Sequence, residues 1–383
     1  MKKHLMKFGS SMVNMMLFHS LVKMKLVHFF SRFKRKNNKI TIGENPPKDK
    51  TLCFLLGSPR SGTSISSLIL GNSKKILSPT ELHLIGFDDL KQRKETMSKT
   101  FCHALTIGLI QTISKIKNIS LLSATALVRD LEETSLDVKK IYDYLLCNMN
   151  EKVLIDKTPT YLGYASDDTL KNRFPHAKYL YLHRHPLSVI LSQKKWLDSF
   201  DDEKYKAMRL KEIERMEKKE VGYFSLTVVK DELFYPMREK LNAYDMEHDF
   251  DKFKSVECRW RLENENAMKF LNTIPEEQKY IFSYENFLKD VPGELAKILR
   301  FLDIDDDPNA MIKVYENQKP PTSLLGIMKK LWQWEILDPN QLFKAGSIDS
   351  SRAEGWKKHA HLWQALDPET QALAQQLGYG EFS

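Results

Sequence analysis

The chain has 383 residues, with 59 Lys and Arg against 50 Asp and Glu, and a formal net charge of +9. Apolar residues make up 42% and charged residues 28%, which excludes a wholly disordered, collagenous or disulfide-rich protein. The surplus charge is confined to residues 1–43, which contain ten Lys and Arg but neither Asp nor Glu. The rest of the chain is close to neutral, which argues against a nucleic-acid-binding module and predicts no nucleic-acid partner.

Residues 1–43 are predicted to form a basic amphipathic arm. Between Val13 and Val27 apolar side chains recur at helical spacing, and a basic cluster follows at residues 34–36. No run of eighteen uncharged apolar residues occurs, so we expect no membrane-spanning helix. Through residues 1–36 the arm can lie in a membrane interface and bind anionic headgroups. The alternative is a helix packed on the body of the protein.

Four cysteines lie far apart in the chain, without C-x-x-C or Cys/His metal spacing. We expect them to be reduced thiols in a reducing compartment. The sequence therefore predicts a cytoplasmic protein, which is peripheral to a membrane if the arm binds one.

Residues 44–50, with Pro46 and Pro47, are predicted to be a linker, and residues 51–383 a single α/β domain. The domain opens with a short apolar run, a glycine-bounded loop and a helical pattern, which is typical of a buried parallel strand followed by a helix. Similar apolar runs then alternate with helical stretches, so we predict a P-loop-type parallel sheet flanked by helices on both faces. The expected strands are Leu52–Leu56, Val153–Ile155, Tyr179–Leu182 and Tyr280–Phe282, and the expected helices include Ser64–Leu70, Leu162–Arg173 and Gly293–Leu302.

Residues 200–253 differ from the rest of the domain, because charges are dense and apolar periodicity is weak outside residues 204–219. We predict a helical insertion over the sheet. It can act as a lid or form a solvated helical hairpin, and the sequence leaves both open.

The segment Gly57–Ser64 reads GSPRSGTS and has the G-x-x-x-x-G spacing of a phosphate-binding loop. Its glycines let the backbone fold tightly round an anion, and the N–H groups at the start of the next helix favour negative charge. A P-loop nucleotide kinase or NTPase would carry Lys after the second glycine, where this chain has Thr63. The cation of this loop is Arg60, which lies between the two glycines. We therefore expect an anionic ligand, bound without a metal, at Arg60, Ser61, Gly62, Thr63 and Ser64; the alternative is a tight turn with no ligand.

With this loop the chain resembles the sulfotransferases that use 3′-phosphoadenosine 5′-phosphosulfate (PAPS), in particular the bacterial and Golgi-type branch whose loop reads PRSGTT or similar. The second signature of that family is an Arg at a strand end with a Ser eight residues later, matched here by Arg184 and Ser192. The resemblance implies that both hold the 3′-phosphate of PAPS. The spacing is consistent with this, because Pro186 suits a first helical turn and Ser192 would lie about two turns into that helix.

Two further segments carry the resemblance. Asp156-Lys157-Thr158-Pro159 is similar to the K-T-P or K-S-P strand end of the branch, which implies that Lys157 approaches the bridging oxygen between sulfate and phosphate. Ser283–Phe287 is similar to the Y-E-x-L/F segment, which implies that Tyr284 stands near the adenine. A glycine-rich basic loop near the carboxyl end of the family is matched only approximately by residues 344–357, and we assign no binding residue there.

The resemblance also implies a general base, and Glu81 lies at the matching place after the first helix. His83 is the second candidate, since cytosolic members of the family use His. The alternative is that Glu81 only caps the following helix. His183 and His185 flank Arg184, and we expect one to face the core and the other the cleft, while His359 and His361 are expected on the surface.

These residues predict an enzyme that transfers the sulfuryl group of PAPS to an acceptor hydroxyl of a glycan, a lipid-linked substrate or a small molecule. Arg60 and Lys157 would stabilise the charge on the departing phosphate, and Glu81 would take the proton of the acceptor. Two alternatives remain: a P-loop nucleotide kinase or NTPase, and a noncatalytic scaffold that binds the desulfated cofactor PAP.

Overall fold

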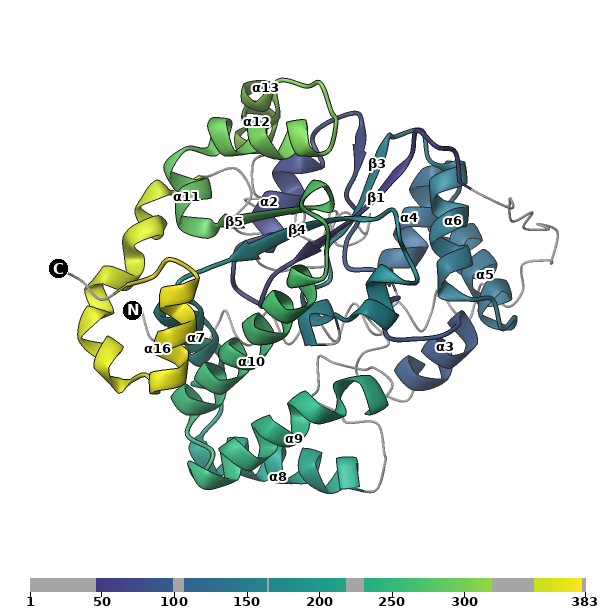
Figure 1. Ribbon diagram of the computed structural model, residues 1–383. Coiled ribbons are helices and arrows are strands. Elements are labelled where there is room, and N and C mark those ends of the chain that lie inside the picture. The colour runs from purple at the N-terminus through teal and green to yellow at the C-terminus, as the bar shows by residue number, and fades with distance from the viewer. Residues whose placement is uncertain (1–45, 99–106, 164, 218–230, 319–347, 381–383) are drawn as a thin grey trace, which may run out of the picture.

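The computed structural model describes residues 46–98, 107–163, 165–217, 231–318 and 348–380. A five-stranded sheet lies at its centre, with the strand order β2-β3-β1-β4-β5 and parallel pairing throughout (Figure 1). This confirms the predicted parallel α/β sheet. The strands are β1 (Thr51–Leu56), β2 (Ile76–Leu77), β3 (Val153–Asp156), β4 (Lys178–His183) and β5 (Lys279–Ser283).

The central strand β1 is apolar at nearly every position because both faces of the sheet are covered. Successive side chains of a strand point to opposite faces. Phe54 and Leu56 belong to one buried cluster, and Cys53 and Leu55 belong to the other. A strand buried on both sides therefore appears in the sequence as a continuous apolar run rather than an alternating one.

Helices cover both faces of the sheet, as predicted. The cluster around Phe54 includes side chains of α4, α5, α6 and α10, and the cluster around Leu55 includes side chains of α2, α11, α12 and α13. The helices are α2 (Thr63–Leu70), α3 (Leu90–Ser98), α4 (Ile107–Lys117), α5 (Leu121–Glu132), α6 (Val138–Asn148), α7 (Pro186–Leu197), α8 (Asp202–Glu217), α9 (Asp231–Glu247), α10 (Lys252–Asn272), α11 (Tyr284–Lys289), α12 (Val291–Phe301), α13 (Pro308–Glu316) and α16 (Pro368–Gln376).

One predicted element has a different form. The crossover helix expected over Leu162–Arg173 is a 3-10 helix, η2 (Pro159–Gly163), followed by a single π-helical turn, η3 (Asp167–Lys171). A capping box between Ser166 and Thr169 begins this second turn. The short strand β2 and the helices α4, α5 and α6 are not among the predicted elements.

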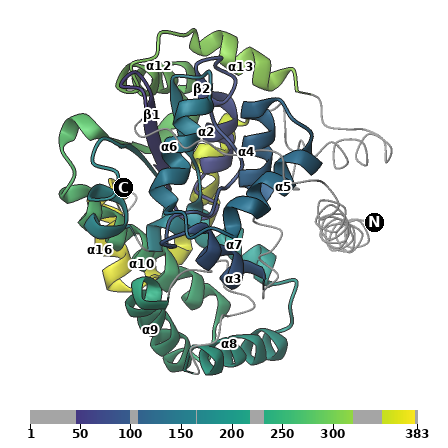
Figure 2. The same cartoon turned by 90° about the vertical axis from the view of Figure 1, so that its right-hand side faces the viewer.

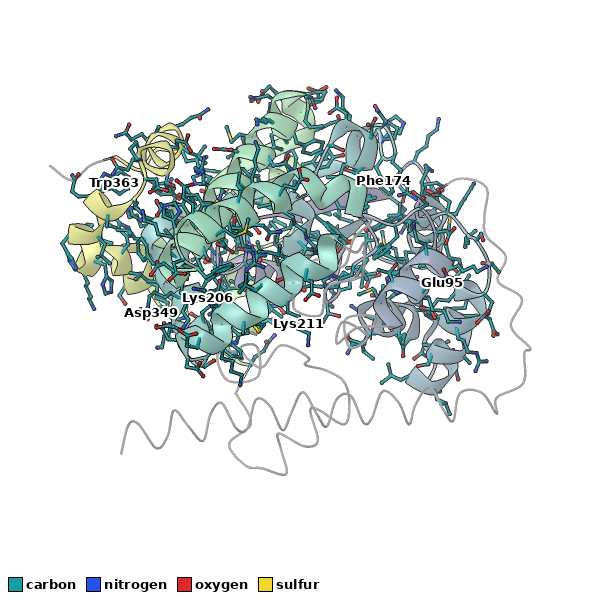
Figure 3. All side chains as sticks on the ribbon, turned by 90° about the horizontal axis from the view of Figure 1, so that it is seen from below. Glu95, Phe174, Lys206, Lys211, Asp349 and Trp363 are labelled. Carbon is teal, nitrogen blue, oxygen red and sulfur yellow. The ribbon has the colours of Figure 1, made fainter. Side chains whose placement is uncertain are left out.

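The helical insertion contains α8 and α9, which lie side by side below the sheet (Figures 1 and 2). Arg209 of α8 joins the two helices, since its guanidinium donates to the Asp245 carboxylate at 2.7 Å and to the Asn242 side-chain oxygen at 3.0 Å. Lys206 and Lys211 mark α8 in the view from below in Figure 3. The prediction of a lid stays a prediction.

The C-terminal segment folds back beside the end of β4. It consists of a 3-10 helix, η5 (Ser350–Ala365), and α16, and its Trp363 packs in a buried cluster with Leu187 of α7 and Trp260 of α10 (Figure 1). Residues 1–45, which include the predicted arm and the first two residues of the predicted linker, lie outside the described ranges, and so does Cys102. Among the described residues, Cys53, Cys147 and Cys258 are not joined in a disulfide. Within the described ranges no helix is long and apolar enough to cross a membrane.

The core should depend strongly on Phe54. Its ring lies 5.4 Å from that of Phe174 and also packs against Tyr142, Tyr161 and Tyr179, all measured between ring centroids. Phe54→Ala should lower the free energy of unfolding by about 3–5 kcal/mol, because the cavity cannot collapse in a packed interior. Urea unfolding followed by circular dichroism measures this loss. The control Val314→Ala, at a half-exposed position, should change the value by less than about 0.5 kcal/mol.

Candidate active site

Each of the five strands leads into a segment that contains a predicted site residue. All five segments begin at the same edge of the sheet. The carboxyl ends of parallel strands meet at one edge, where such sheets bind ligands. β1 leads into the Gly57–Ser64 loop, β3 is followed by Lys157, β4 by Arg184 and β5 by Tyr284. Glu81 lies four residues beyond the end of β2.

The shape of the loop requires glycine at two positions. A Cβ atom at Gly57 would lie 2.7 Å from the Leu182 carbonyl oxygen, and one at Gly62 would lie 2.3 Å from the ring of Tyr284. Gly62 also has φ of 101°, a conformation that side-chain-bearing residues rarely adopt. It is the N-cap of α2 and provides no side-chain cap, so the first N–H groups of this helix are available to an anion.

Glu81, His83, Lys157 and Ser64 meet on one side of this loop. The Lys157 ammonium donates to Glu81 Oε1 at 2.8 Å and to Ser64 Oγ at 3.4 Å. The other carboxylate oxygen of Glu81 accepts a hydrogen bond from His83 Nε2 at 3.1 Å. Lys157 is buried, with 3% of its surface exposed. The structure therefore unites both base candidates with the predicted catalytic lysine.

These contacts determine the charge of Glu81. Burial alone would raise the pKa of its carboxyl, but the charge of Lys157 and the hydrogen bond from His83 outweigh burial and hold the pKa at about 2. Glu81 is therefore ionised at neutral pH and neutralises Lys157.

Arg60, Arg184, Ser192 and Tyr284 form a second group on the loop. Arg60 Nε donates to Ser192 Oγ at 3.1 Å, and the Arg184 guanidinium donates to the Arg60 carbonyl oxygen at 2.8 Å. The same guanidinium lies over the Tyr284 ring, 4.1 Å from its centroid. Tyr284 is buried and contacts both Gly62 and Arg184. The eight-residue spacing of Arg184 and Ser192 thus brings the two side chains to the same loop residue.

The Arg184 group fits an anion such as a phosphate. Arg184 Nε is buried and has no hydrogen-bond partner within the described residues. A buried cationic donor without a partner is costly unless a ligand completes its hydrogen bonding, and a guanidinium binds phosphate oxygens in a forked geometry.

Three supporting residues are not among the predicted site residues. Gln193 donates to the Pro59 carbonyl oxygen at 3.1 Å, and Asn264 donates to Ser58 Oγ at the same distance. Trp260 donates to the Arg184 carbonyl oxygen at 3.3 Å. Trp260 and Asn264 are one turn apart on α10, so their spacing in the sequence indicates that they share a helical face. Nothing in the sequence indicates that this face contacts the loop.

The prediction for the histidines beside Arg184 is wrong, because neither faces the cleft. His183 and His185 are both buried, and burial lowers their pKa values to about 4 and about 3. His183 Nδ1 is hydrogen-bonded to the Tyr379 hydroxyl at 2.8 Å, and the His185 ring stacks on Trp356 at 4.2 Å between centroids. The C-terminal segment therefore covers the end of β4. His359 and His361 are exposed, as predicted.

The comparisons with known proteins agree with this geometry. A family model described as the sulfotransferase family matches residues 53–236. A solved sulfotransferase domain from the curacin biosynthetic pathway is 27% identical, with a TM-score of 0.59 over 86% of this chain and 98% of that one. The sulfotransferase domain of the Synechococcus PCC 7002 olefin synthase shares the fold, at 23% identity and a TM-score of 0.61 over 89% of this chain and 99% of that one.

A curated relative, the nodulation protein NoeE of Sinorhizobium fredii (strain NBRC 101917 / NGR234), is 27% identical over 143 residues. These residues are 37% of this chain and 31% of NoeE, so the similarity spans about a third of the relative. The parallel sheet and the strand-end loop define an α/β protein of the P-loop type. Within that class, the chain is similar to the sulfotransferase family, whose model matches just under half of it, and to a solved sulfotransferase domain.

Lys157 should control the titration of Glu81. In Lys157→Met the opposing charge is gone while burial remains, so the pKa of Glu81 should rise from about 2 to its ordinary value of 4.5 or above. Carbon NMR of Glu-labelled protein over a pH series measures this. The depressed pKa stabilises the fold above pH 4.5, and that contribution is lost as the pH falls toward 2, so the variant should also lose this pH dependence. Lys139→Met, which breaks an ion pair to Asp143, is the control; an unchanged Glu81 titration in Lys157→Met would contradict the pairing.

Proposed function

We propose that this protein transfers the sulfuryl group of PAPS to an acceptor hydroxyl. The proposal rests mainly on one observation: the Gly57–Ser64 loop has the Lys157 ammonium on one side, paired with Glu81, and the Arg184 guanidinium on the other. PAPS has two anionic ends, a phosphosulfate and a 3′-phosphate, and the two groups suit one end each. The resemblance of the loop and of the Arg184–Ser192 pair to the PAPS-binding signatures supports the same assignment.

We assign the phosphosulfate end to Lys157 and the loop residues Arg60, Ser61, Gly62, Thr63 and Ser64. The 3′-phosphate is assigned to Arg184 and Ser192. Tyr284 stays the candidate for the adenine end, and its ring contacts Arg184, which we assign to the 3′-phosphate. In this scheme Arg60 and Lys157 supply the positive charge that Mg²⁺ and the P-loop lysine supply in NTPases.

PAPS supplies an activated sulfuryl group, and negative charge builds on the phosphate as the S–O bond breaks. Lys157 and the loop N–H groups stabilise that charge, which is usually the largest contribution in such sites. Glu81 accepts the acceptor's proton as the acceptor oxygen bonds to sulfur. A carboxylate with a pKa of about 2 is a weak base, but a phosphate oxygen that shares Lys157 weakens the ion pair, and burial then raises the pKa of Glu81.

For the acceptor, we propose the hydroxyl of a glycan, a lipid-linked substrate or a small molecule. The basic arm favours the first two, because residues 1–36 carry the charge and the apolar spacing that suit an anionic membrane surface. We likewise propose a cytoplasmic protein that is peripheral to such a surface.

Arg184→Ala should weaken the binding of PAP by at least about tenfold, since a charge-assisted hydrogen bond contributes about 1.5–3 kcal/mol. Isothermal calorimetry measures the affinity. Arg300→Ala, which removes an exposed arginine of α12, is the control and should bind PAP like the wild type. Equal affinities in both variants would sink the 3′-phosphate assignment. A thermal shift with ATP larger than that with PAP would favour a nucleotide kinase or NTPase instead.

Glu81→Gln should lower the rate of sulfate transfer by about 10²–10⁴-fold, because the amide cannot accept the proton. PAP affinity should stay equal or increase, since Lys157 loses a competing partner. The assay follows radiolabelled sulfate from PAPS into a glycan and lipid extract. His83→Gln in parallel separates the two base candidates, and Glu133→Gln is the surface control. A fully active Glu81→Gln dismisses Glu81 as the base, and a wild-type protein that binds PAP but transfers nothing supports a noncatalytic scaffold.

A further inference from the structure

A buried arginine grips the backbone next to Glu81. Arg93 of α3 has no exposed surface. Its Nε donates to the His83 carbonyl oxygen at 2.9 Å, and its Nη2 donates to the Leu82 carbonyl oxygen at 3.0 Å. Its Nη1 lies 3.7 Å from Glu132 Oε1 of α5. The guanidinium therefore spans two consecutive carbonyls that directly follow the candidate base.

A second clamp holds the same loop from the sheet side. The Tyr161 hydroxyl accepts from the Leu84 N–H at 3.0 Å and donates to the buried Asp156 carboxylate at 2.8 Å. Asp156 is the last residue of β3 and precedes Lys157. Through Tyr161, the Asp156 carboxylate thus connects the backbone after Glu81 to the end of β3, which Lys157 follows.

The loop has a conformation that must be held in place. His83 has φ of 48°, in the left-handed region where residues with a side chain are strained by about 1–2 kcal/mol. On the other side α4 packs closely, because a Cβ atom at Gly108 would lie 2.1 Å from the Glu81 carbonyl oxygen. A strained backbone persists only where its surroundings determine it, and here Arg93 supplies two of the contacts.

From this arrangement we propose that Arg93 is a positioning residue for catalysis: by holding the Leu82 and His83 carbonyls, it sets the Glu81 carboxylate against Lys157. The catalytic part of this inference rests on the proposed function. Burying an arginine costs free energy of folding, and apolar side chains of similar volume would pack in the same space equally well. Its forked geometry supplies what those side chains cannot, a fixed backbone at two adjacent residues.

Arg93→Lys keeps the charge opposite Glu132 but cannot span both carbonyls. We expect the transfer rate to fall about 10–100-fold, because a displacement of about 1 Å at a reacting group costs up to that much, while PAP affinity stays within twofold. In the free protein, without PAPS, the pKa of Glu81 should rise from about 2 toward 4.5 as the carboxylate moves away from Lys157. The same Glu-labelled carbon NMR titration measures this directly.

A second variant separates position from stability. Arg93→Met combined with Glu132→Met replaces the buried ion pair by apolar side chains, an exchange that is often neutral or stabilising. We expect the double variant to fold. It should transfer sulfate as slowly as Arg93→Lys and show the same raised pKa of Glu81. Arg173→Lys is the matched control, since Arg173 donates to the Phe87 and Asp88 carbonyl oxygens, only a few residues beyond the loop.

An unchanged Glu81 titration in both Arg93 variants overturns the proposal. So does an equal rise of the Glu81 pKa in Arg173→Lys, which would show that any loosening of the segment has the same effect. If the titration shifts only in the Arg93 variants while the wild-type protein transfers no sulfate from PAPS, the placement of Glu81 by Arg93 is supported and the proposed function is contradicted.

Discussion

The buried ammonium of Lys157 requires a negative partner, and much of the site follows from how that requirement is met. An unpaired charge in an interior costs several kcal/mol, so the carboxylate of Glu81 must lie within reach whenever no other anion does. This couples the segment after β2 to the end of β3, although 76 residues separate the two side chains. An anionic ligand competes for the same ammonium. Ligand binding and the basicity of Glu81 are therefore linked, because each oxygen that shares Lys157 leaves Glu81 less stabilised as an anion.

The arginines on the other side of the loop make their hydrogen bonds and ring contact with neutral groups, and Arg184 also interacts with the charge of Glu285. Arg184 lies on the Tyr284 ring and donates to a carbonyl, and Arg60 donates to the Ser192 hydroxyl. These contacts orient the guanidinium groups but do not cancel their charge. Tyr284 also fixes the loop, since its ring fills the space that a side chain at Gly62 would need. One aromatic ring therefore orients the Arg184 guanidinium and constrains the backbone of the loop at Gly62.

The fold and the first elements of the site could be predicted because their signals are local. A strand buried on both faces is a continuous apolar run, and the glycines of the loop are required by backbone geometry at Gly57 and Gly62. The supporting residues could not be predicted, since their roles arise from packing between distant segments. Arg93 lies on a polar helix, and only the fold shows that its guanidinium is buried against the backbone that follows Glu81. His183 and His185 could not be placed for the same reason: they contact Trp356 and Tyr379 of the C-terminal segment, and Tyr379 lies 196 residues after His183.

The proposed function requires a nearly neutral body to attract a multiply anionic ligand, and the arrangement of charged side chains at the site allows this. Outside residues 1–43 the basic and acidic residues almost balance, so the whole molecule exerts no strong attraction. Balance over the body still permits imbalance at one edge of the sheet. Lys157 is neutralised by Glu81 and Arg93 faces Glu132, whereas Arg60 and Arg184 keep their charge beside the open N-terminus of α2. The guanidinium groups of Arg60 and Arg184, next to the N-terminus of α2, favour an anion at the loop, as we propose. In the proposed function, the neutral hydrogen-bond partners of Arg60 and Arg184, rather than a surplus of basic residues, leave positive charge for an anionic ligand.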